Sequence, residues 1–346
     1  MTTGNPLTRR ELLAALLGSA ALSGCSYLER AEGDPRQAEA WPEPEGGIGG
    51  TGLRGVGLVG ALTDFGSFRV NGRRVETPDD AIYVDAFGPI PKSRIGIGHS
   101  LTLETEARGP VLVARRVELT QPLIGAVEEV AEGGRRLRVL GVTVRVDPDA
   151  HRALRPGDRV AVSGVWRGAE VAASRLDPAP AGGLDVIAGA MGASDGSGAR
   201  RVGGARVALP RGARPTGVAA GYVSAVGVWS PQDAGRDTGQ DRGRGVLKAE
   251  RARFGRFTGA APLTELSVEG YLEAVAAAPN FEISGLGHSF DAAAQLAAFA
   301  EGRTLFEGPY RGDFLVATGA ALPERFSERR SALRAGALRP EPVARS

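Results

Sequence analysis

The sequence has very few of the residues that build disulfides, metal centres and redox sites. It contains one cysteine, Cys25, and three histidines, His99, His151 and His288. One cysteine cannot form an internal disulfide, and no histidine is followed by another ligand at metal-binding spacing. We therefore expect no metal, no cofactor and no disulfide in the fold.

Aromatic residues and lysines are scarce as well. Aromatic residues make up 5% of the chain, and Lys92 and Lys248 are its only lysines. The net charge is +2, and the 42 basic and 40 acidic residues are dispersed along the chain. No long basic block is present that would bind a phosphate backbone, so we expect no nucleic-acid partner.

The N-terminus, in contrast, has the features of an export signal. Arg9 and Arg10 precede an apolar run over residues 12–22, which is shorter than the roughly 20 residues that span a bilayer. The run ends in four residues that resemble the bacterial lipobox, namely Leu22, Ser23, Gly24 and Cys25. The resemblance implies cleavage after residue 24 and lipid attachment to the Cys25 thiol. The alternative is a buried cysteine at the end of an ordinary helix.

Residues 8–13 read Thr-Arg-Arg-Glu-Leu-Leu and resemble a twin-arginine export signal, with Leu12 where phenylalanine is commonest. The general secretory route stays open because of that departure. Residues 25–54 are rich in proline and glycine, and they are expected to form a flexible tether. We therefore place the protein on the periplasmic side of the cell envelope, bound by lipid to the outer rather than the inner membrane.

The rest of the chain shows an internal repeat. Residues 124–178 contain five runs that alternate between apolar and polar residues, separated by glycine turns, with about one helical turn expected at 148–154. The layout can be traced four times, although glycine- and alanine-rich strands can also align by chance. The predicted units are 55–121, 122–181, 182–258 and 259–323, followed by a disordered tail at 324–346. The third unit carries a polar insertion at 232–245, and the fourth a helix at 291–300 with Asp291 at its N-cap.

Five short strands with a helical turn before the fourth predict a small closed barrel, because closure removes the edges of a sheet. The pattern resembles the bacterial family DUF5666, and its matching positions here are Val144, Asp147, Leu154, Gly157, Asp158 and Val160. The resemblance implies tandem OB-like barrels in exported or lipid-anchored proteins. The matching positions are turn glycines and core valines, and the resemblance implies no catalytic residues. The first unit departs from the pattern by an insertion at 86–97, and the fourth has Gly302-Arg303 where the family has Gly-Asp.

Three aromatic residues, Trp166, Trp229 and Tyr310, share one hairpin position in three of the predicted units. They can act as plugs or contacts between domains. Alternatively, they form a row that faces a ligand, as in OB-like barrels that bind sugars or single strands. We carry them forward as a possible binding surface.

Residues 192–196 match the pattern Gly-x-Ser-x-Gly, but a serine triad also needs a histidine and a carboxylate held beside the serine. No phosphate-binding loop occurs in the sequence. Gly-His-Ser occurs twice, but His99 opens the fourth strand of one unit and His288 lies in the third strand of another. The sequence therefore predicts a non-enzymatic binding or interaction module whose partner is an envelope protein or a polysaccharide. A structural spacer of the envelope is the alternative, followed by a carbohydrate-binding or hydrolytic protein with a site between domains.

Overall fold

The computed structural model of the chain describes residues 54–213, 221–231, 245–274, 280–287, 289–291, 302–339 and 341–342. The predicted export signal at Arg9 and Arg10, the lipobox and Cys25 lie outside these residues. So do His288 and most of the predicted insertion at 232–245 and of the predicted helix at 291–300. Among the described residues, no helix has the length and apolar character needed to cross a bilayer.

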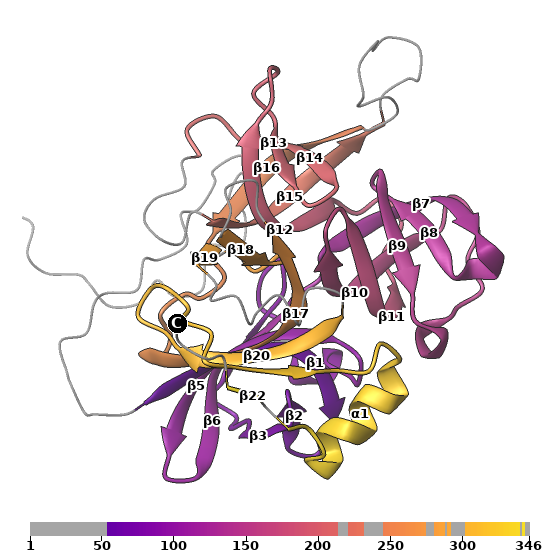
Figure 1. The fold of residues 1–346 in the computed structure, drawn as a ribbon. Helices are drawn as coiled ribbons and strands as arrows, with labels where there is room; N and C mark the ends of the chain where they lie inside the picture. The colour runs from indigo at the N-terminus through magenta and orange to yellow at the C-terminus, as the bar shows by residue number, and fades with distance from the viewer. Residues whose placement is uncertain are drawn as a thin grey trace, which may run out of the picture. The chain divides into compact units, whose positions relative to one another are not determined.

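The first five-stranded ring, called barrel 1, follows directly on the predicted tether (Figure 1). Its strands are β1 (Gly55–Asp64), β2 (Phe68–Val70), β3 (Arg73–Glu76), β5 (Ser100–Arg108) and β6 (Val111–Leu119). The ring runs β1-β2-β3-β6-β5 and back to β1, and only β3 and β6 pair in parallel. The hairpin between β2 and β3 turns at Asn71 and Gly72, which both have positive φ, as tight hairpin turns require. The short strand β4 (Ile82–Val84) pairs with β6 outside this ring.

Two further rings, barrel 2 and barrel 3, have the same strand order. Barrel 2 contains β7 (Leu123–Ala131), β8 (Arg136–Val139), β9 (Val142–Val146), β10 (Arg159–Arg167) and β11 (Glu170–Pro178). Barrel 3 contains β12 (Asp185–Ser194), β13 (Arg200–Val202), β14 (Ala205–Ala208), β15 (Tyr222–Ser230) and β16 (Val246–Phe254). The 3-10 turn η3 (Pro148–Ala150) precedes the fourth strand of barrel 2. The prediction of tandem closed five-stranded β-barrels with short helical turns is confirmed.

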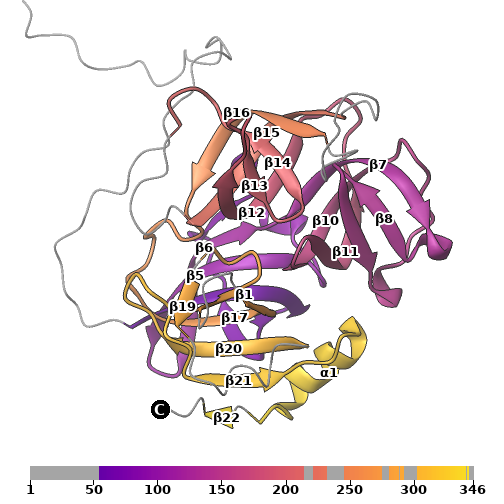
Figure 2. The same ribbon diagram turned by 45° about the horizontal axis from the view of Figure 1, so that its top comes forward.

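The fourth set of strands, called unit 4, keeps part of this order. It contains β17 (Leu263–Ala274), β18 (Asn280–Ile283), β19 (Ser289–Asp291), β20 (Arg303–Pro309) and β21 (Thr318–Ala321). Figure 2 shows β17, β20 and β21 side by side, with β22 (Glu341–Pro342) on the outer edge. Within the described part of the chain no pairing joins β19 to β21, so this ring is not closed there. Asp291, the predicted N-cap, is the last residue of β19.

The units are joined through their first strands. β1 of barrel 1 pairs in parallel with β17 of unit 4, from Gly55 opposite Leu263 to Val59 opposite Val268. β7 of barrel 2 pairs with β12 of barrel 3 in the antiparallel sense. The first unit is thus bonded to the fourth and the second to the third.

Each barrel is filled by the apolar residues of its alternating strands. In barrel 2 these include Val127, Val139 and Val162, which are almost completely buried. The cores of barrels 2 and 3 form one continuous cluster, whereas barrel 1 has a cluster of its own. Alternation with period two is what places these side chains inside.

The prediction of a disordered tail from residue 324 is wrong for its central part. Residues Phe326–Ala335 form helix α1, which ends at Gly336 in a left-handed conformation and lies beside β21 in Figure 2. The backbone N–H groups of Phe326 and Ser327 at its start donate to the carboxylates of Asp147 and Asp149 in barrel 2, each over 2.7 Å. These carboxylates satisfy N–H groups that have no partner inside the helix.

The residues on the buried face of α1 explain why this helix was not predicted from the sequence. Leu333 packs with Leu305, Ala320 and Leu322 of unit 4, but the side chain at the centre of that face is Arg329, which is completely buried. An arginine on the inner face breaks the apolar stripe by which an amphipathic helix is detected.

Candidate functional site

A cavity lined by described residues lies between barrel 1 and barrel 2, and we call it the barrel 1–barrel 2 cavity. Its volume is about 610 Å³, which is in the size range of small-molecule sites. The apolar part of its wall includes Leu119, Ile124, Ala161 and Leu184, of which the first three are buried. Ligand sites commonly combine such a wall with a few polar groups.

The first polar group is His99, which connects the two barrels. Its Nε2 lies 2.8 Å from Oδ2 of Asp177 on β11, and its Nδ1 accepts the backbone N–H of Gly96 over 3.0 Å. Because Nδ1 accepts, the proton of the neutral ring is on Nε2, and His99 donates it to Asp177. Both ring nitrogens are therefore engaged, and this histidine holds Asp177 in place rather than offering a free base.

Asp177 is also bound by Arg175, whose Nε donates over 2.8 Å to Oδ2 and whose Nη2 donates over 2.7 Å to Oδ1. Burial by itself would raise the pKa of Asp177. The hydrogen bonds from His99 and Arg175 outweigh it and hold the pKa well below its usual range. The carboxylate thus stays charged and fully occupied by protein donors.

Gln121 differs from these groups because its amide has no partner within the described part of the chain. The residue is only 8% exposed, it lines the cavity, and no hydrogen bond joins its side chain to the residues that the structure describes. The Gln121 amide can both donate to and accept from a molecule held in the cavity.

The arginines of the cavity wall fall into two kinds. Arg159 is neutralised by Asp185 over 2.8 Å, and Arg175 is neutralised by Asp177. Arg94, in contrast, is exposed and forms no ion pair within the described part of the chain. Its guanidinium is the group on this wall that can pair with an anion of a ligand.

The insertion of barrel 1 supplies this part of the wall. Residues 86–97 depart from the repeat pattern, and Phe87 and Arg94 of this segment line the cavity. Phe87 is 41% exposed, which is unusual for a phenylalanine that serves only the core. The insertion at 86–97, which departs from the repeat pattern, therefore forms part of the cavity wall.

The comparison with known families concerns the opposite wall. Residues 124–177 match the family described as "Domain of unknown function (DUF5666)". Barrel 2 is a DUF5666 domain. It contributes Ile124, Arg159, Ala161 and Asp177 to the cavity, and no curated protein matches the chain.

The structure places the three aromatic residues of the predicted binding surface in three different surroundings. Trp166, on β10 of the DUF5666 domain, is 3% exposed and donates from Nε1 to the carbonyl oxygen of Ala188 over 2.8 Å. It fills a space left by Gly203, whose φ is +53° and whose added Cβ would lie 2.2 Å from the indole ring. Trp166 is thus a contact between barrels, which was the other interpretation of these residues.

The other two aromatic residues lie in separate surroundings. Trp229 is partly buried and faces Gly141 of the DUF5666 domain. Tyr310 packs on Phe257, with 5.9 Å between the ring centroids. The shared hairpin position therefore does not bring the three rings to one ligand-binding face.

A second cavity, of about 380 Å³, contains a pair of carboxyl groups. Glu273 on β17 and Glu282 on β18 lie directly opposite each other. Burial, and then the neighbouring charge of Glu273, raise the pKa of Glu282 to about 7. Two opposed carboxylates disfavour each other's ionisation, so this pair holds a proton in weakly acidic solution.

The remaining titratable groups form no metal centre within the described ranges, where no cluster of three acidic, histidine or cysteine side chains occurs. His151 is exposed, and its Nε2 lies 2.8 Å from the carbonyl oxygen of Gly133. Sequence reasoning missed His99 and Gln121 as site residues, because their partners and cavity neighbours come from another barrel and leave no spacing pattern.

Proposed function

We propose that this chain is an exported, lipid-anchored protein of the bacterial envelope that binds an organic ligand in the barrel 1–barrel 2 cavity without transforming it. The observation that carries this proposal is the side chain of Gln121, which lines a cavity of about 610 Å³ and has no hydrogen-bond partner among the described residues. The ligand has an apolar body for the wall of Leu119, Ile124 and Leu184. It also has an anionic or hydrogen-bonding group for Arg94 and Gln121.

The contacts of His99 support binding rather than catalysis. A general base needs a ring nitrogen that can take a proton from a substrate. In the structure, Nδ1 is bound to the backbone of Gly96 and Nε2 to Asp177. The group that most resembles a catalytic dyad is thus committed to joining barrel 1 to the DUF5666 domain.

Binding can be tested with anilinonaphthalene sulfonate, a fluorescent probe that has an apolar ring system and an anionic group. Ala179 lines the cavity and is partly buried, so Ala179→Phe reduces the space available to the probe. We expect the variant to bind at least about ten-fold more weakly, a loss of about 1.4 kcal/mol. Ala172→Phe is the matched control, because Ala172 is also a partly buried alanine, lies on the nearby strand β11 and does not line the cavity. Equal affinity of both variants and the parent protein would contradict the site.

The lipid anchor is tested separately. Cys25→Ser removes the thiol that the lipobox pattern assigns to the lipid, and the protein is expected to move from the membrane fraction to the soluble fraction. Ser26→Ala keeps the thiol and serves as the control. Unchanged membrane retention of the Cys25→Ser protein would refute lipid anchoring and leave the binding proposal intact.

A second candidate function, a spacer of the envelope, is supported by the strand pairing. Barrel 1 is bonded to unit 4, and the DUF5666 domain is bonded to barrel 3. Helix α1 adds hydrogen bonds to barrel 2 and to barrel 1, through Asp147 and Thr63 respectively. A spacer without a ligand would show no difference between the Ala179→Phe and Ala172→Phe proteins.

A further inference from the structure

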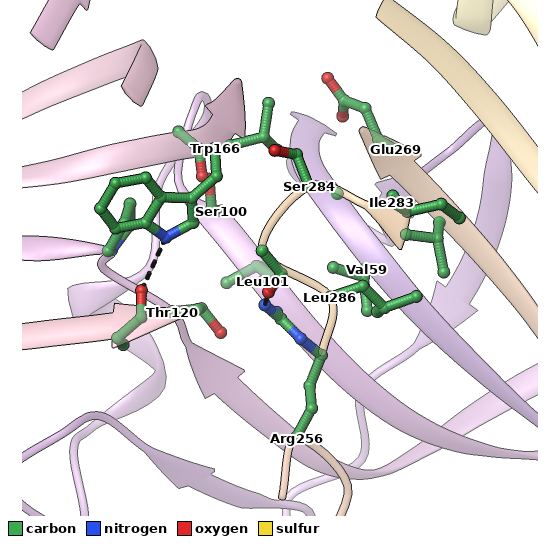
Figure 3. A pocket seen from close by; sticks show the side chains of 17 residues that line it. Val59, Ser100, Leu101, Thr120, Trp166, Arg256, Glu269, Ile283, Ser284 and Leu286 are labelled. Carbon is green, nitrogen blue, oxygen red and sulfur yellow. Dashed lines mark hydrogen bonds between the residues drawn. The ribbon is translucent and has the colours of Figure 1, made fainter. Parts of the chain in front are cut away.

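A small cavity is lined by residues from all four sets of strands (Figure 3). Its volume is about 30 Å³, and a cavity needs about 10–15 Å³ by this measure to hold one water molecule. It can therefore hold one or two water molecules or a single monatomic ion. Its lining includes Ser100 of barrel 1, Trp166 of the DUF5666 domain, Ala188 of barrel 3 and Ser284 of unit 4. It shares no lining residue with the barrel 1–barrel 2 cavity.

The cationic group of this cavity is Arg256, which Figure 3 shows reaching in between Leu101 and Leu286. It is 8% exposed. Its Nη1 donates to Oγ1 of Thr102 over 3.1 Å, and its Nη2 donates to the carbonyl oxygen of Gly285 over 2.9 Å. Its Nε is buried and has no hydrogen-bond partner. An arginine has five N–H donors, so more than half of those of Arg256 are unused.

No carboxylate among the described residues compensates the charge of Arg256. The guanidinium lies over the ring of Tyr222, 4.2 Å from the centroid, and its two hydrogen-bond acceptors are neutral. Arginine stays protonated in proteins, and a buried charge without a counter-ion is strongly unfavourable. The side chain therefore needs an anion that the described residues do not supply.

Glu269 also lines the cavity, but its charge is already matched. Arg303 donates from Nη1 to Oε1 of Glu269 over 2.6 Å, and Nε of Arg329 lies 3.0 Å from the same oxygen. Two buried guanidiniums, those of Arg303 and Arg329, thus already share this one carboxylate. The next acid, Glu324, lies 3.9 Å from Arg303 and its side chain is 55% exposed, so solvent screens its charge.

The carboxylates on the other side of Arg256 are occupied too. Glu118 pairs with Arg253 and with Arg116. Glu104 accepts the backbone N–H groups of Thr258 and Ala260, each over 2.8 Å. Neither carboxylate forms an ion pair with Arg256 among the described residues.

From this geometry we infer that the small cavity is a site for one halide ion, chloride under physiological conditions, bound by the unused N–H groups of Arg256. The cavity is too small for phosphate, sulfate or an organic carboxylate. Because the ion would contact all four sets of strands, it stabilises their assembly and is lost when they separate.

The decisive experiment uses bromide, which replaces chloride and scatters anomalously. In crystals of the unaltered protein grown with sodium bromide, an anomalous peak is expected within hydrogen-bonding distance of the Arg256 guanidinium. A site that refines as water with no anomalous signal, or with an adventitious ion only at exposed arginines, overturns the inference.

A solution experiment adds the energetic consequence. The midpoint of thermal unfolding is expected to rise and then saturate as sodium chloride replaces sodium gluconate at constant ionic strength, because an ion that binds only the folded state stabilises it. Arg256→Gln removes the charge and should abolish the rise. Arg251→Gln, at an exposed arginine of the same segment, should keep it. An equal rise in both variants contradicts the site, and if Arg256→Gln does not fold, the bromide crystals still decide.

Discussion

Replacing Glu269 by glutamine should be among the most destabilising conservative substitutions in this protein. The Glu269 side chain is completely buried, and its Oε1 is held by Arg303 and Arg329. Its Oε2 accepts the backbone N–H of Ala61 in barrel 1 over 2.9 Å. Glu269→Gln keeps the shape but leaves two buried guanidiniums without a buried acid.

The expected loss of stability follows from the two buried guanidiniums that Glu269→Gln leaves unpaired. Removing one partner of a buried ion pair costs about 3–5 kcal/mol, because the other partner is left as an uncompensated charge. Arg329→Met should cost less, about 1–3 kcal/mol, since Glu269 keeps Arg303 and Ala61. The loss then comes from the bond of Arg329 to the carbonyl oxygen of Glu324, over 2.8 Å, and from the packing of α1.

The assay is urea unfolding followed by circular dichroism, for both variants and for Glu328→Gln, an exposed glutamate of α1. The expected order of lost stability is Glu269→Gln, then Arg329→Met, then Glu328→Gln with almost none. If Arg329→Met loses as much as Glu269→Gln, the packing of the helix and not the charge is responsible, and the reasoning fails.

The pH dependence provides an independent check. Burial would raise the pKa of Glu269, but the charges of Arg329 and Arg303 and the hydrogen bond from Ala61 outweigh it and lower the pKa below 4.5. A carboxyl with a lowered folded-state pKa stabilises the protein above its unfolded pKa, and the contribution is lost as the pH falls. The difference between Glu269→Gln and the parent protein should therefore shrink below about pH 4.5.

Three further predictions follow from single contacts. Trp166→Ala should cost about 3–5 kcal/mol in urea unfolding, because it empties a packed space between barrels. The pKa of Glu282, beside Glu273, is raised to about 7, so the parent protein should lose stability as the pH rises from about 4.5 toward 7. Glu282→Gln should remove this loss. Asp149→Ala should cost at most about 1 kcal/mol, by removing an acceptor of the Ser327 N–H, and hydrogen exchange should rise in the first turn of α1.

Each of these predictions has an outcome that would contradict it. A Trp166→Ala protein as stable as the parent would show that the surrounding glycines close the space. An unchanged pH profile for Glu282→Gln would show that this carboxyl ionises normally. Faster exchange throughout α1 in Asp149→Ala, and not only in its first turn, would mean that the helix docks through this contact alone.

The strands of the DUF5666 domain could be read from the sequence almost residue by residue. Alternation predicted runs at 136–141 and 158–164, and the structure has β8 at Arg136–Val139 and β10 at Arg159–Arg167. Alternation and turn glycines are local signals, so they survive in a single sequence. The pairing of β1 with β17 joins residues far apart in the sequence, and neither strand has a sequence pattern that identifies its partner.

The candidate site was hidden for the same reason. His99 and Asp177 belong to different barrels, and Gln121 lies in the short link between β6 and β7. Trp166 was singled out from the sequence, but a tryptophan that fills a contact between domains and a tryptophan that faces a ligand have the same sequence pattern. Only the glycines that it contacts across a barrel boundary distinguish them.

The bonding of β1 to β17 also sets an order in which the protein can fold. Ala61 of β1 and Glu269 of β17 are 208 residues apart, whereas Ile124 of β7 and its partner Val186 of β12 are 62 residues apart (186 − 124). Contacts between distant residues form late, because a long loop must close before they are made. The DUF5666 domain and barrel 3 can therefore join while the chain is still being synthesised. Barrel 1, which leaves the ribosome first, pairs with unit 4 only after β17 has been made.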